Sequence, residues 1–344
     1  MNSKKMLQAA VIGLGNIGFL FDLDPLRKGT WSHVTAYIKS RRVLLAGAVE
    51  VDEKKISLFH KHHDAIPVYR EISDLMRHCC PDIVSICTPT ASHYPILREL
   101  TQYPVKGIFC EKPLSFDIEE AAEMVRICDE RGIILAVNHT RRWDDHFLYV
   151  KAVIQSGEIG NIRTINMTYP GQIFNIGTHL LDALRMLAGN EPVMVSGVAA
   201  DPDIDDPDIS GWLKFNDHKV CTINSVGKRE DLILELDFIG DKGRVIILEN
   251  GETIEKYIFQ ESTRYSGYNE LERVPMEPVE RKDRLVEAVV DVASVIMGEK
   301  DQVNCTGQDG LASLRLVGAM IESASCNGLP ITLLLEKKEE DKYE

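Results

Sequence analysis

The chain has 344 residues, of which 44% are hydrophobic and 27% are charged, a composition typical of a globular protein with two domains. Its formal net charge of −14 argues against nucleic acid or an anionic membrane as a partner, because both are bound through clustered Lys and Arg side chains. The first residues lack a signal-peptide pattern and no apolar run reaches about 18 residues, so we expect a cytoplasmic protein.

The first predicted element is an apolar strand over Ala9–Ile12, followed at once by a Gly-x-Gly-x-x-Gly turn and a helix start. In such a turn one glycine permits the tight bend, one lets the backbone approach a pyrophosphate, and one lets the helix pack on its strand. Free N–H groups and the positive end of the helix dipole would hold the phosphates. The turn predicts a dinucleotide site with these contact residues: Gly13, Gly15, Asn16, Ile17 and Gly18.

A second apolar strand, predicted over 44–50, ends in Glu50. Dinucleotide folds carry an acid at this place, about 20 residues after the last glycine, which binds the adenosine ribose. Glu50 lies 32 positions after Gly18 (50 − 18), and the irregular segment Phe19–Trp31 predicts an insertion of the missing length. We therefore interpret Glu50 as the ribose-binding acid, although an ordinary surface glutamate at a strand end is the alternative.

The charge of Glu50 also predicts which coenzyme binds. A carboxylate accepts hydrogen bonds from ribose hydroxyls and repels a 2′-phosphate, so NAD is favoured. NADP stays open as the less favoured coenzyme, because four cationic side chains lie nearby in the sequence: Arg41, Arg42, Lys54 and Lys55.

Up to about residue 138, apolar strands alternate with amphipathic helices, which predicts a parallel sheet covered on both faces. The expected strands are 9–12, 44–50, 83–88, 107–110 and 133–137, with helices near 53–63, 71–78, 93–103 and 117–131. The fold class predicted for this part is a doubly wound Rossmann sheet.

After about residue 145 the pattern changes to half-buried strands with alternating polarity, which predicts an α+β domain with an open, largely antiparallel sheet. Helices are expected near 145–156, 281–298 and 308–326, and strands at 162–167, 212–215, 220–224, 233–238, 245–248 and 331–335. We divide the chain into a coenzyme-binding domain (1–138), a substrate and oligomerisation domain (139–335) and a solvated tail (336–344).

Four landmarks in order resemble the glucose–fructose oxidoreductase, inositol dehydrogenase and rhizopine-catabolism superfamily, abbreviated Gfo/Idh/MocA. They are the glycine turn, the strand 81–90 with His93, the sequence Cys110-Glu111-Lys112-Pro113, and Gly177-Thr178-His179-Leu180-Leu181-Asp182. The resemblance spans nearly the whole chain. It implies an NAD-dependent dehydrogenase of sugars or polyols that forms a homodimer or homotetramer.

Moving a hydride from a carbinol carbon to nicotinamide requires a base for the hydroxyl proton and a donor for the developing alkoxide. His179 is the natural base, because imidazole titrates near neutral pH. The resemblance places Lys112 beside the nicotinamide as the cationic donor, with Glu111 also at the coenzyme, and implies a cis bond between Lys112 and Pro113. The alternative for His179 is an ordinary histidine of the core, and the alternative for Lys112 is a surface lysine at the end of a strand.

The chain departs from the polyol-dehydrogenase pattern at Asn175, where those members carry Asp four residues before the histidine. Asparagine can hydrogen-bond a substrate, but it can neither take a proton nor keep Lys112 protonated. Asn-x-x-x-His resembles the branch that acts on nucleotide-linked amino sugars, including UDP-N-acetylglucosamine-type 3-dehydrogenases. This favours a sugar nucleotide used in surface polysaccharide or glycoprotein assembly.

Several further residues are weaker candidates. The resemblance implies that Thr88, Pro89, Thr90 and His93 touch the nicotinamide ribose. Asp182 could orient His179 or face solvent. Arg142 and Trp143 could reach substrate or simply pack, and Trp31 and His33 could cover the coenzyme.

Three other readings of the function stay open: a free polyol or inositol-type dehydrogenase, a non-catalytic NAD-sensing regulator of the same fold, and a glycosidase that uses NAD for transient oxidation. The eight Cys residues lack metal-ligand spacing, so we expect no metal site.

Overall fold

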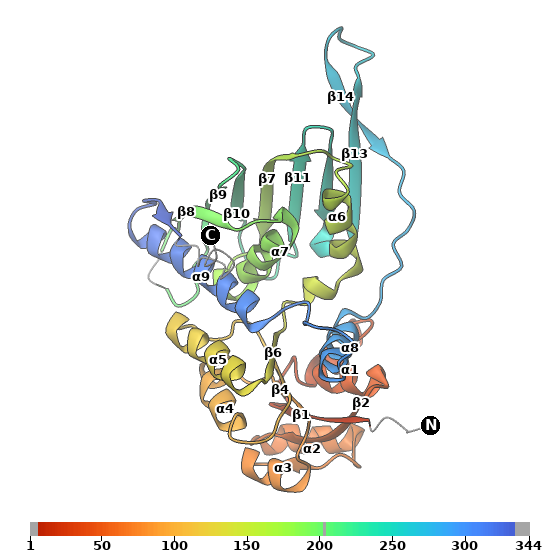
Figure 1. The fold of residues 1–344 in the computed structure, drawn as a ribbon, viewed down its shortest axis with the longest axis vertical. Coiled ribbons are helices and arrows are strands. Elements are labelled where there is room, and N and C mark those ends of the chain that lie inside the picture. Colours follow the sequence, from red (N-terminus) through yellow and green to blue (C-terminus); the bar gives the residue numbers. More distant parts are fainter. Residues whose placement is uncertain (1–5, 202–203, 334–344) are drawn as a thin grey trace, which may run out of the picture. The chain divides into compact units, whose positions relative to one another are not determined.

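A computed structural model describes residues 6–201 and 204–333, so the expected tail at 336–344 lies outside the described residues. The chain forms two compact units. Of the described residues, the first unit contains those up to Asp144 and Arg281–Leu314, and the second contains those between Asp145 and Glu280 and those from Arg315 onward. Each unit has its own sheet (Figure 1).

The first unit is a doubly wound Rossmann fold, as predicted. Its six strands are all parallel and lie in the order β3-β2-β1-β4-β5-β6. They are β1 (Leu7–Ile12), β2 (Val43–Val49), β3 (Val68–Tyr69), β4 (Ile83–Ile86), β5 (Gly107–Cys110) and β6 (Ile134–Val137). The chain order reverses between β1 and β4, and ligands of open α/β sheets bind outside the carboxyl ends of the strands at such a point.

The helices of this unit are α1 (His33–Ser40), α2 (Glu53–His62), α3 (Ile72–His78), α4 (His93–Leu100), α5 (Ile118–Arg131) and α8 (Arg284–Ile296), with short 3₁₀ turns η1 (Leu20–Leu23), η2 (Thr90–Ser92) and η3 (Thr140–Trp143). Two elements, α1 and β3, were not predicted. Helix α5 begins and ends as its sequence indicates, because the Asp117 side chain accepts the N–H groups of Glu119 and Glu120 and Gly132 adopts φ +63°.

The predicted insertion interrupts the helix that follows the glycine turn. One helical turn forms, since Phe19 N–H bonds to Gly15 O at 2.9 Å, and the helix resumes when His33 N–H bonds to Ile17 O at 3.0 Å. An uninterrupted helix would place residue 21 (17 + 4) at the position of His33, so the insertion is 12 residues long (33 − 21). Without it, Glu50 lies 20 positions after Gly18 (32 − 12), which is the expected spacing.

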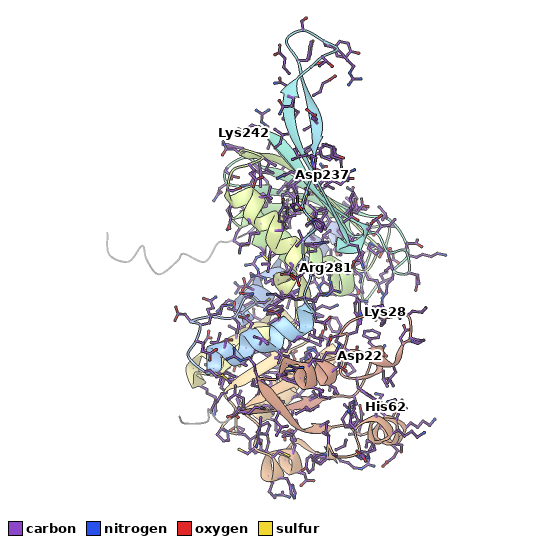
Figure 2. All side chains as sticks on the ribbon, turned by 90° about the vertical axis from the view of Figure 1, so that its right-hand side faces the viewer. Asp22, Lys28, His62, Asp237, Lys242 and Arg281 are labelled. Carbon is purple, nitrogen blue, oxygen red and sulfur yellow. The ribbon has the colours of Figure 1, made fainter. Side chains whose placement is uncertain are left out.

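The inserted loop is tied at its base and packed by its own side chains. The carboxylate of Asp22 accepts hydrogen bonds from Trp31 N–H at 2.7 Å and Ser32 Oγ at 2.5 Å. Asp22 and Lys28, both in this loop, are labelled in Figure 2. Within the loop, the Arg27 guanidinium lies 3.9 Å from the Phe21 ring centroid and 5.0 Å from the Trp31 ring centroid. Arg284 of α8 lies 5.1 Å from the same Trp31 ring. A loop with close ends and internal packing is an Ω-loop.

Helix α8 belongs to the first unit, whereas the sequence analysis placed it in the domain that follows residue 138. The reason is packing: a Cβ on Gly107 of β5 would lie 2.9 Å from Ile296 Cδ1 and 3.5 Å from Val292 Cγ1. Helix α8 therefore covers the first sheet directly, and the absence of a side chain at Gly107 allows the close approach.

The second unit is an α+β structure with an open, largely antiparallel nine-stranded sheet, in the order β14-β13-β12-β11-β7-β10-β9-β8-β15. Strands β7 and β10 pair in parallel, and the other neighbours are antiparallel. The strands are β7 (Ile162–Tyr169), β8 (Pro192–Val198), β9 (Ser210–Phe215), β10 (Val220–Ser225), β11 (Glu235–Gly240), β12 (Gly243–Leu248), β13 (Thr253–Glu261), β14 (Asn269–Val274) and β15 (Ile331–Thr332).

The helices of the second unit are α6 (Asp145–Gln155) and α7 (Thr178–Ala188), preceded by a π-helical turn η4 (Ile173–Gly177), and a short 3₁₀ turn η5 (Glu249–Gly251) also occurs. Helix α9 (Gly307–Ser325) begins in the first unit and ends in the second. One core unites α6, α7 and the end of α9 with the inner face of the sheet, around Phe147, Leu184 and Met320. Among the helices of residues 6–201 and 204–333, none is both long and apolar enough to cross a membrane.

Candidate functional site

The glycine turn follows β1 at the carboxyl edge of the first sheet. Gly13 adopts φ +93°, and a Cβ there would lie 2.9 Å from Cys87 O after the neighbouring strand β4. A Cβ on Gly18 would lie 2.0 Å from Gly13 O, so this position admits only glycine. At Gly15, by contrast, a Cβ would meet nothing within 4 Å.

The open space at Gly15 fits a ligand that approaches the backbone closely. The first helical turn leaves the N–H groups of Gly15, Asn16 and Ile17 without intrahelical partners, and the positive end of the helix dipole lies at the same place. Asn16 is exposed, and Gly15 and Ile17 are half-buried. Donors without a partner beside an empty position are what a pyrophosphate requires.

Glu50 follows β2 and lies against the glycine turn. Its Oε2 atom accepts Leu14 N–H at 2.8 Å and lies 3.6 Å from Lys55 Nζ, and its Oε1 atom accepts Val51 N–H at 2.9 Å. The residue is 7% exposed, which contradicts the alternative of an ordinary surface glutamate. The carboxylate is therefore held in one orientation beside the turn.

Thr88, Pro89 and Thr90 form the exit of β4, where Ser92 Oγ donates to Thr88 Oγ1 at 2.8 Å. The His93 ring is enclosed, at 1% exposure, and its nitrogens lie 2.9 Å from Thr88 O and 3.0 Å from Pro113 O. Burial lowers the pKa of His93 below its ordinary value. His93 thus ties the exit of β4 to the turn after β5, and its enclosed ring is not available to a coenzyme ribose.

Lys112 follows β5 on the same edge of the sheet and is half-buried. The Lys112–Pro113 bond is cis, as the resemblance implied. The preceding Glu111 is 8% exposed, and its Oε1 atom lies 2.9 Å from His33 Nε2 and 2.5 Å from Asn138 Nδ2. Glu111 therefore faces the protein interior, not an open coenzyme surface.

The charge of Glu111 is stabilised by its neighbours. Burial by itself raises the pKa of this carboxyl, but hydrogen bonds from His33 and Asn138 and the charge of Lys112 outweigh burial and lower the pKa below its ordinary value. The side chain is thus a buried carboxylate at neutral pH, next to the ammonium of Lys112.

Arg142 and Trp143 pack within the first unit. Arg142 donates to Asn304 O at 3.0 Å and pairs with Asp309 at 2.9 Å, and it is 8% exposed. Trp143 is 3% exposed and donates its indole N–H to Asp291 at 2.9 Å. These contacts favour the packing alternative for both residues.

In the second unit, Asn175 and His179 share one helical run, because the π-turn η4 continues directly into α7. A separation of four residues places them on the same helical face. Both side chains are half-buried, and Asn175 Nδ2 donates to Gln172 Oε1 at 3.1 Å. π-Turns are rare and occur often at functional sites.

The loop before α7 is held by three successive residues of another loop. Asp206 accepts the N–H groups of Phe174 and Asn175 at 2.7 and 3.2 Å, Pro207 O accepts Ile173 N–H at 3.0 Å, and Asp208 accepts Gln172 N–H at 2.5 Å. Asp182, one turn after His179, is 0% exposed and lies 3.9 Å from Arg185. The alternative in which Asp182 faces solvent is therefore wrong.

Sequence reasoning missed the residues that hold Glu111. His33 was singled out only as a possible cover for the coenzyme, yet it is 0% exposed and lies beneath the carboxyl edge of the sheet with Ser85 and Tyr37. The available signal was a histidine directly after the predicted insertion. The role of His33 could not be predicted from this signal, because the place of His33 on the helix depends on the exact length of the insertion, which the sequence does not give.

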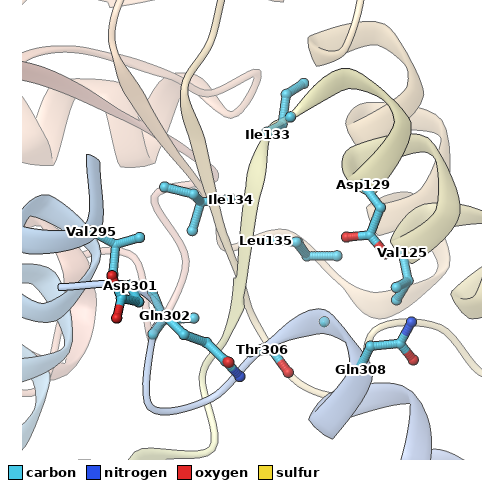
Figure 3. A pocket seen from close by; sticks show the side chains of 13 residues that line it. Val125, Asp129, Ile133, Ile134, Leu135, Val295, Asp301, Gln302, Thr306 and Gln308 are labelled. Atoms are coloured by element: carbon cyan, nitrogen blue, oxygen red, sulfur yellow. The ribbon is translucent and has the colours of Figure 1, made fainter. Parts of the chain in front are cut away.

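A separate cavity of about 470 Å³ lies in the first unit between the start of β6, the end of α5 and the segment before α9 (Figure 3). Its lining includes Ile134, Leu135, Asp129 and Gln308. This cavity is at the amino end of β6, opposite the edge that carries Gly13 and Lys112, and it is not the candidate coenzyme site.

Two family models match the two parts of this chain. The Gfo/Idh/MocA family model described as "Oxidoreductase family, NAD-binding Rossmann fold" matches residues 7–139. The model described as "Oxidoreductase family, C-terminal alpha/beta domain" matches residues 168–333.

Among curated relatives, the uncharacterized oxidoreductase YrbE of Bacillus subtilis is 25% identical, over 96% of this chain and 97% of its own. Inositol 2-dehydrogenase of Rhizobium meliloti is 34% identical, over 35% of this chain and 40% of its own. Among solved structures, the WlbA dehydrogenase of Bordetella pertussis in complex with NADH and UDP-GlcNAcA has a TM-score of 0.77 at 20% identity, covering 96% of this chain and 100% of that one. At this identity the last likeness shows the fold alone.

Proposed function

The chain belongs to the Gfo/Idh/MocA family of oxidoreductases and is a dehydrogenase of CH–OH donors with an NAD-binding Rossmann fold, and from this premise we propose that it oxidises a nucleotide-linked amino sugar with NAD. The substrate is of the UDP-N-acetylglucosamine type, and surface polysaccharide assembly is the process that consumes the product. The observation that supports the substrate class is Asn175, four residues before His179 on one helical face.

NAD, when bound, supplies the nicotinamide ring that accepts the hydride. The N–H groups of Gly15, Asn16 and Ile17 would hold its phosphates, and Glu50 would hold its adenosine ribose. Thr88, Pro89 and Thr90 line the exit of β4, where the nicotinamide half is expected. The open position at Gly15 is the feature of this chain that fits the group.

The chain's own residues divide the proton and charge transfers. His179 takes the hydroxyl proton as the C–H bond releases its hydride and the carbonyl forms. The ammonium of Lys112 stabilises the negative charge that develops on the same oxygen. Asn175 can hydrogen-bond the substrate but takes no proton, so His179 is the one acceptor that the proposal uses.

Three other functions of the family fold are outcomes of one set of assays. The protein is incubated with NAD and a UDP-amino sugar, free myo-inositol or a chromogenic glycoside, and NADH absorbance or release of the chromophore is followed. We expect kcat/KM for a UDP-amino sugar to exceed that for inositol at least tenfold. The reverse order would support the polyol dehydrogenase. Tight NAD binding without turnover of any sugar or glycoside would support the regulator, and NAD-dependent cleavage of a glycoside would support the glycosidase.

The choice of NAD over NADP rests on Glu50. Replacing Glu50 with Gln keeps an acceptor for Leu14 N–H but removes the charge that repels a 2′-phosphate. We expect the ratio of kcat/KM for NAD to that for NADP to fall about tenfold, since a hydrogen bond to a charged group contributes about 1.5–3 kcal/mol. The control is Glu53→Gln, which removes an exposed carboxylate of α2 that pairs with Arg70. An unchanged ratio in E50Q would remove Glu50 from the coenzyme site.

A homodimer or homotetramer remains part of the proposal. The mass of the purified protein by light scattering tests it directly, and a monomer would contradict it.

A further inference from the structure

A chain of buried polar side chains runs beneath the carboxyl edge of the first sheet. It links Tyr37 and His33 of α1, Ser85 of β4, and Glu111 and Asn138, which directly follow β5 and β6. None of these five residues is more than 8% exposed, and Tyr37, His33 and Ser85 are 0% exposed. Buried polar groups carry a large cost unless each is satisfied, so such a network has a defined hydrogen-bond order.

The first half of that order follows from Glu111. Its lowered pKa keeps it an ionised carboxylate, which only accepts hydrogen bonds. His33 Nε2, 2.9 Å from Glu111 Oε1, must therefore carry a proton, and Asn138 donates to the same oxygen from Nδ2 at 2.5 Å.

The second half follows from Tyr37. Tyr37 is 0% exposed, and among the described residues Ser85 is the one hydrogen-bond partner of its hydroxyl, with the two oxygens 2.7 Å apart. The buried phenol proton therefore goes to Ser85 Oγ. The Ser85 hydroxyl keeps its own proton to give, and His33 Nδ1 lies 2.8 Å away, so in this order Nδ1 accepts and the ring proton lies on Nε2. Every hydrogen-bond donor of this five-residue network therefore points toward Glu111.

The same histidine is tied to the glycine turn. His33 N–H bonds to Ile17 O at 3.0 Å and Val34 N–H bonds to Gly18 O at 3.1 Å, so α1 continues the helical turn that begins at Gly15. His33 thus joins two places in the first unit: the phosphate-binding turn through its backbone, and the residue before Lys112 through its ring. The inserted Ω-loop leaves this connection intact, because the helix resumes in register.

We infer that His33 is a positioning residue. By donating a hydrogen bond from Nε2 to the Glu111 carboxylate, it sets the place of the adjacent Lys112 relative to the glycine turn. The inference rests on the proposed function, because Lys112 acts on substrate only if the chain is a dehydrogenase. A displacement of the order of 1 Å at a reacting group costs about a hundredfold in rate. A rigid connection between the glycine turn and Lys112 would therefore raise kcat by keeping the ammonium in place.

Other groups near Glu111 do not replace this hydrogen bond. Burial raises the pKa values of the Cys87 and Cys110 thiols well above the ordinary value, so both stay neutral. The ring of His93 is enclosed by the carbonyl groups of Thr88 and Pro113. Of the two described side chains that hydrogen-bond the Glu111 carboxylate, His33 is the one that belongs to the helix of the glycine turn.

The first test is spectroscopic and needs neither coenzyme nor substrate. Two-dimensional ¹H–¹⁵N NMR of the imidazole nitrogens, with His33 assigned by its loss in His33→Gln, should show a neutral ring protonated at Nε2 at pH 7. In Glu111→Gln the Nε2–H pattern should weaken or exchange with the other tautomer. An imidazolium or an Nδ1–H tautomer in the wild-type protein would overturn the hydrogen-bond order.

The second test is kinetic. His33→Leu should lower kcat about tenfold or more, with the dissociation constant for NADH, measured by fluorescence, changed less than threefold. His33→Gln, whose side-chain amide can still donate to Glu111, should recover kcat to within about threefold of wild type. The matched control is His60→Leu, an exposed histidine of α2, which should leave both constants unchanged.

The two tests separate this inference from the proposed function. If no sugar is oxidised, the proposed function fails and the NMR experiment still judges the network. If His33→Leu folds and retains wild-type kcat, the positioning role is wrong although the dehydrogenase stands. If His33→Leu does not fold, the pair His33→Gln and His33→Asn decides, because the amide of Gln reaches the place of Nε2 and that of the shorter Asn does not. A tenfold loss of kcat in His33→Asn with near-wild-type kcat in His33→Gln supports the role, and equal kcat in the two variants contradicts it.

Discussion

A Lys112→Ala variant should fold normally and lose about 10²–10³-fold in kcat/KM for the sugar substrate. Removing one preorganised donor from a developing oxyanion has an effect of this size in acyl-transfer enzymes. Lys112 is half-buried at the carboxyl edge of the first sheet and directly follows Glu111, whose pKa is lowered in part by the charge of Lys112. Steady-state rates of NADH formation measure the loss, and the thermal midpoint reports on folding.

The control for Lys112→Ala is Lys61→Ala. Lys61 is an exposed lysine in the last turn of α2, on the same unit, and its removal should change kcat/KM less than twofold. A Lys112→Ala enzyme with nearly wild-type rate would show that the lysine belongs to the structure of the turn and not to the reaction.

Replacing His179 with Ala should lower kcat by about 10²–10⁴-fold, the contribution of a positioned general base. Added imidazole should restore part of the activity, because the truncated side chain leaves room for a free base at the same place. The dependence of kcat on imidazole concentration measures this rescue, and saturation would indicate binding at the vacated position.

His218→Asn serves as the control for His179→Ala. His218 is exposed, lies in the turn before β10 and has φ +67°, a conformation that Asn tolerates. If His179→Ala kept its rate, or if imidazole accelerated the wild-type and variant proteins equally, another group would have to accept the hydroxyl proton.

Five of the six strands in the first sheet could be predicted, because each of the five is a short apolar run bounded by polar or glycine-containing segments; the two-residue strand β3 could not. Strands β1 and β5 begin and end within two residues of the expected positions. The end of α5 was also predicted, because Gly132 tolerates the positive φ of a helix C-terminus. Helix α1 was missed because an irregular segment with Asp, Pro and Gly precedes it and hides its periodicity.

The second sheet was predicted less completely. Strands β8, β13 and β14 were not expected, and β13 and β14 form a long hairpin whose pattern of exposure alternates little. In β13 seven successive residues are half-buried, so the polarity pattern does not distinguish its two faces. The π-turn before α7 also depends on Asp206, more than thirty positions away, which accepts the N–H groups of Phe174 and Asn175.

The sequence by itself determined the features that depend on local geometry. Gly13 and Gly18 are required by backbone angle and by contacts within one turn, and Asn175 and His179 share a face because of helical periodicity. Tertiary structure alone decided the partners of Glu111: His33 lies 78 positions away and Asn138 lies 27 positions away. Such contacts arise only when the helix after the glycine turn packs against β4, β5 and β6, because hydrogen bonds between distant residues leave no periodic mark in the chain.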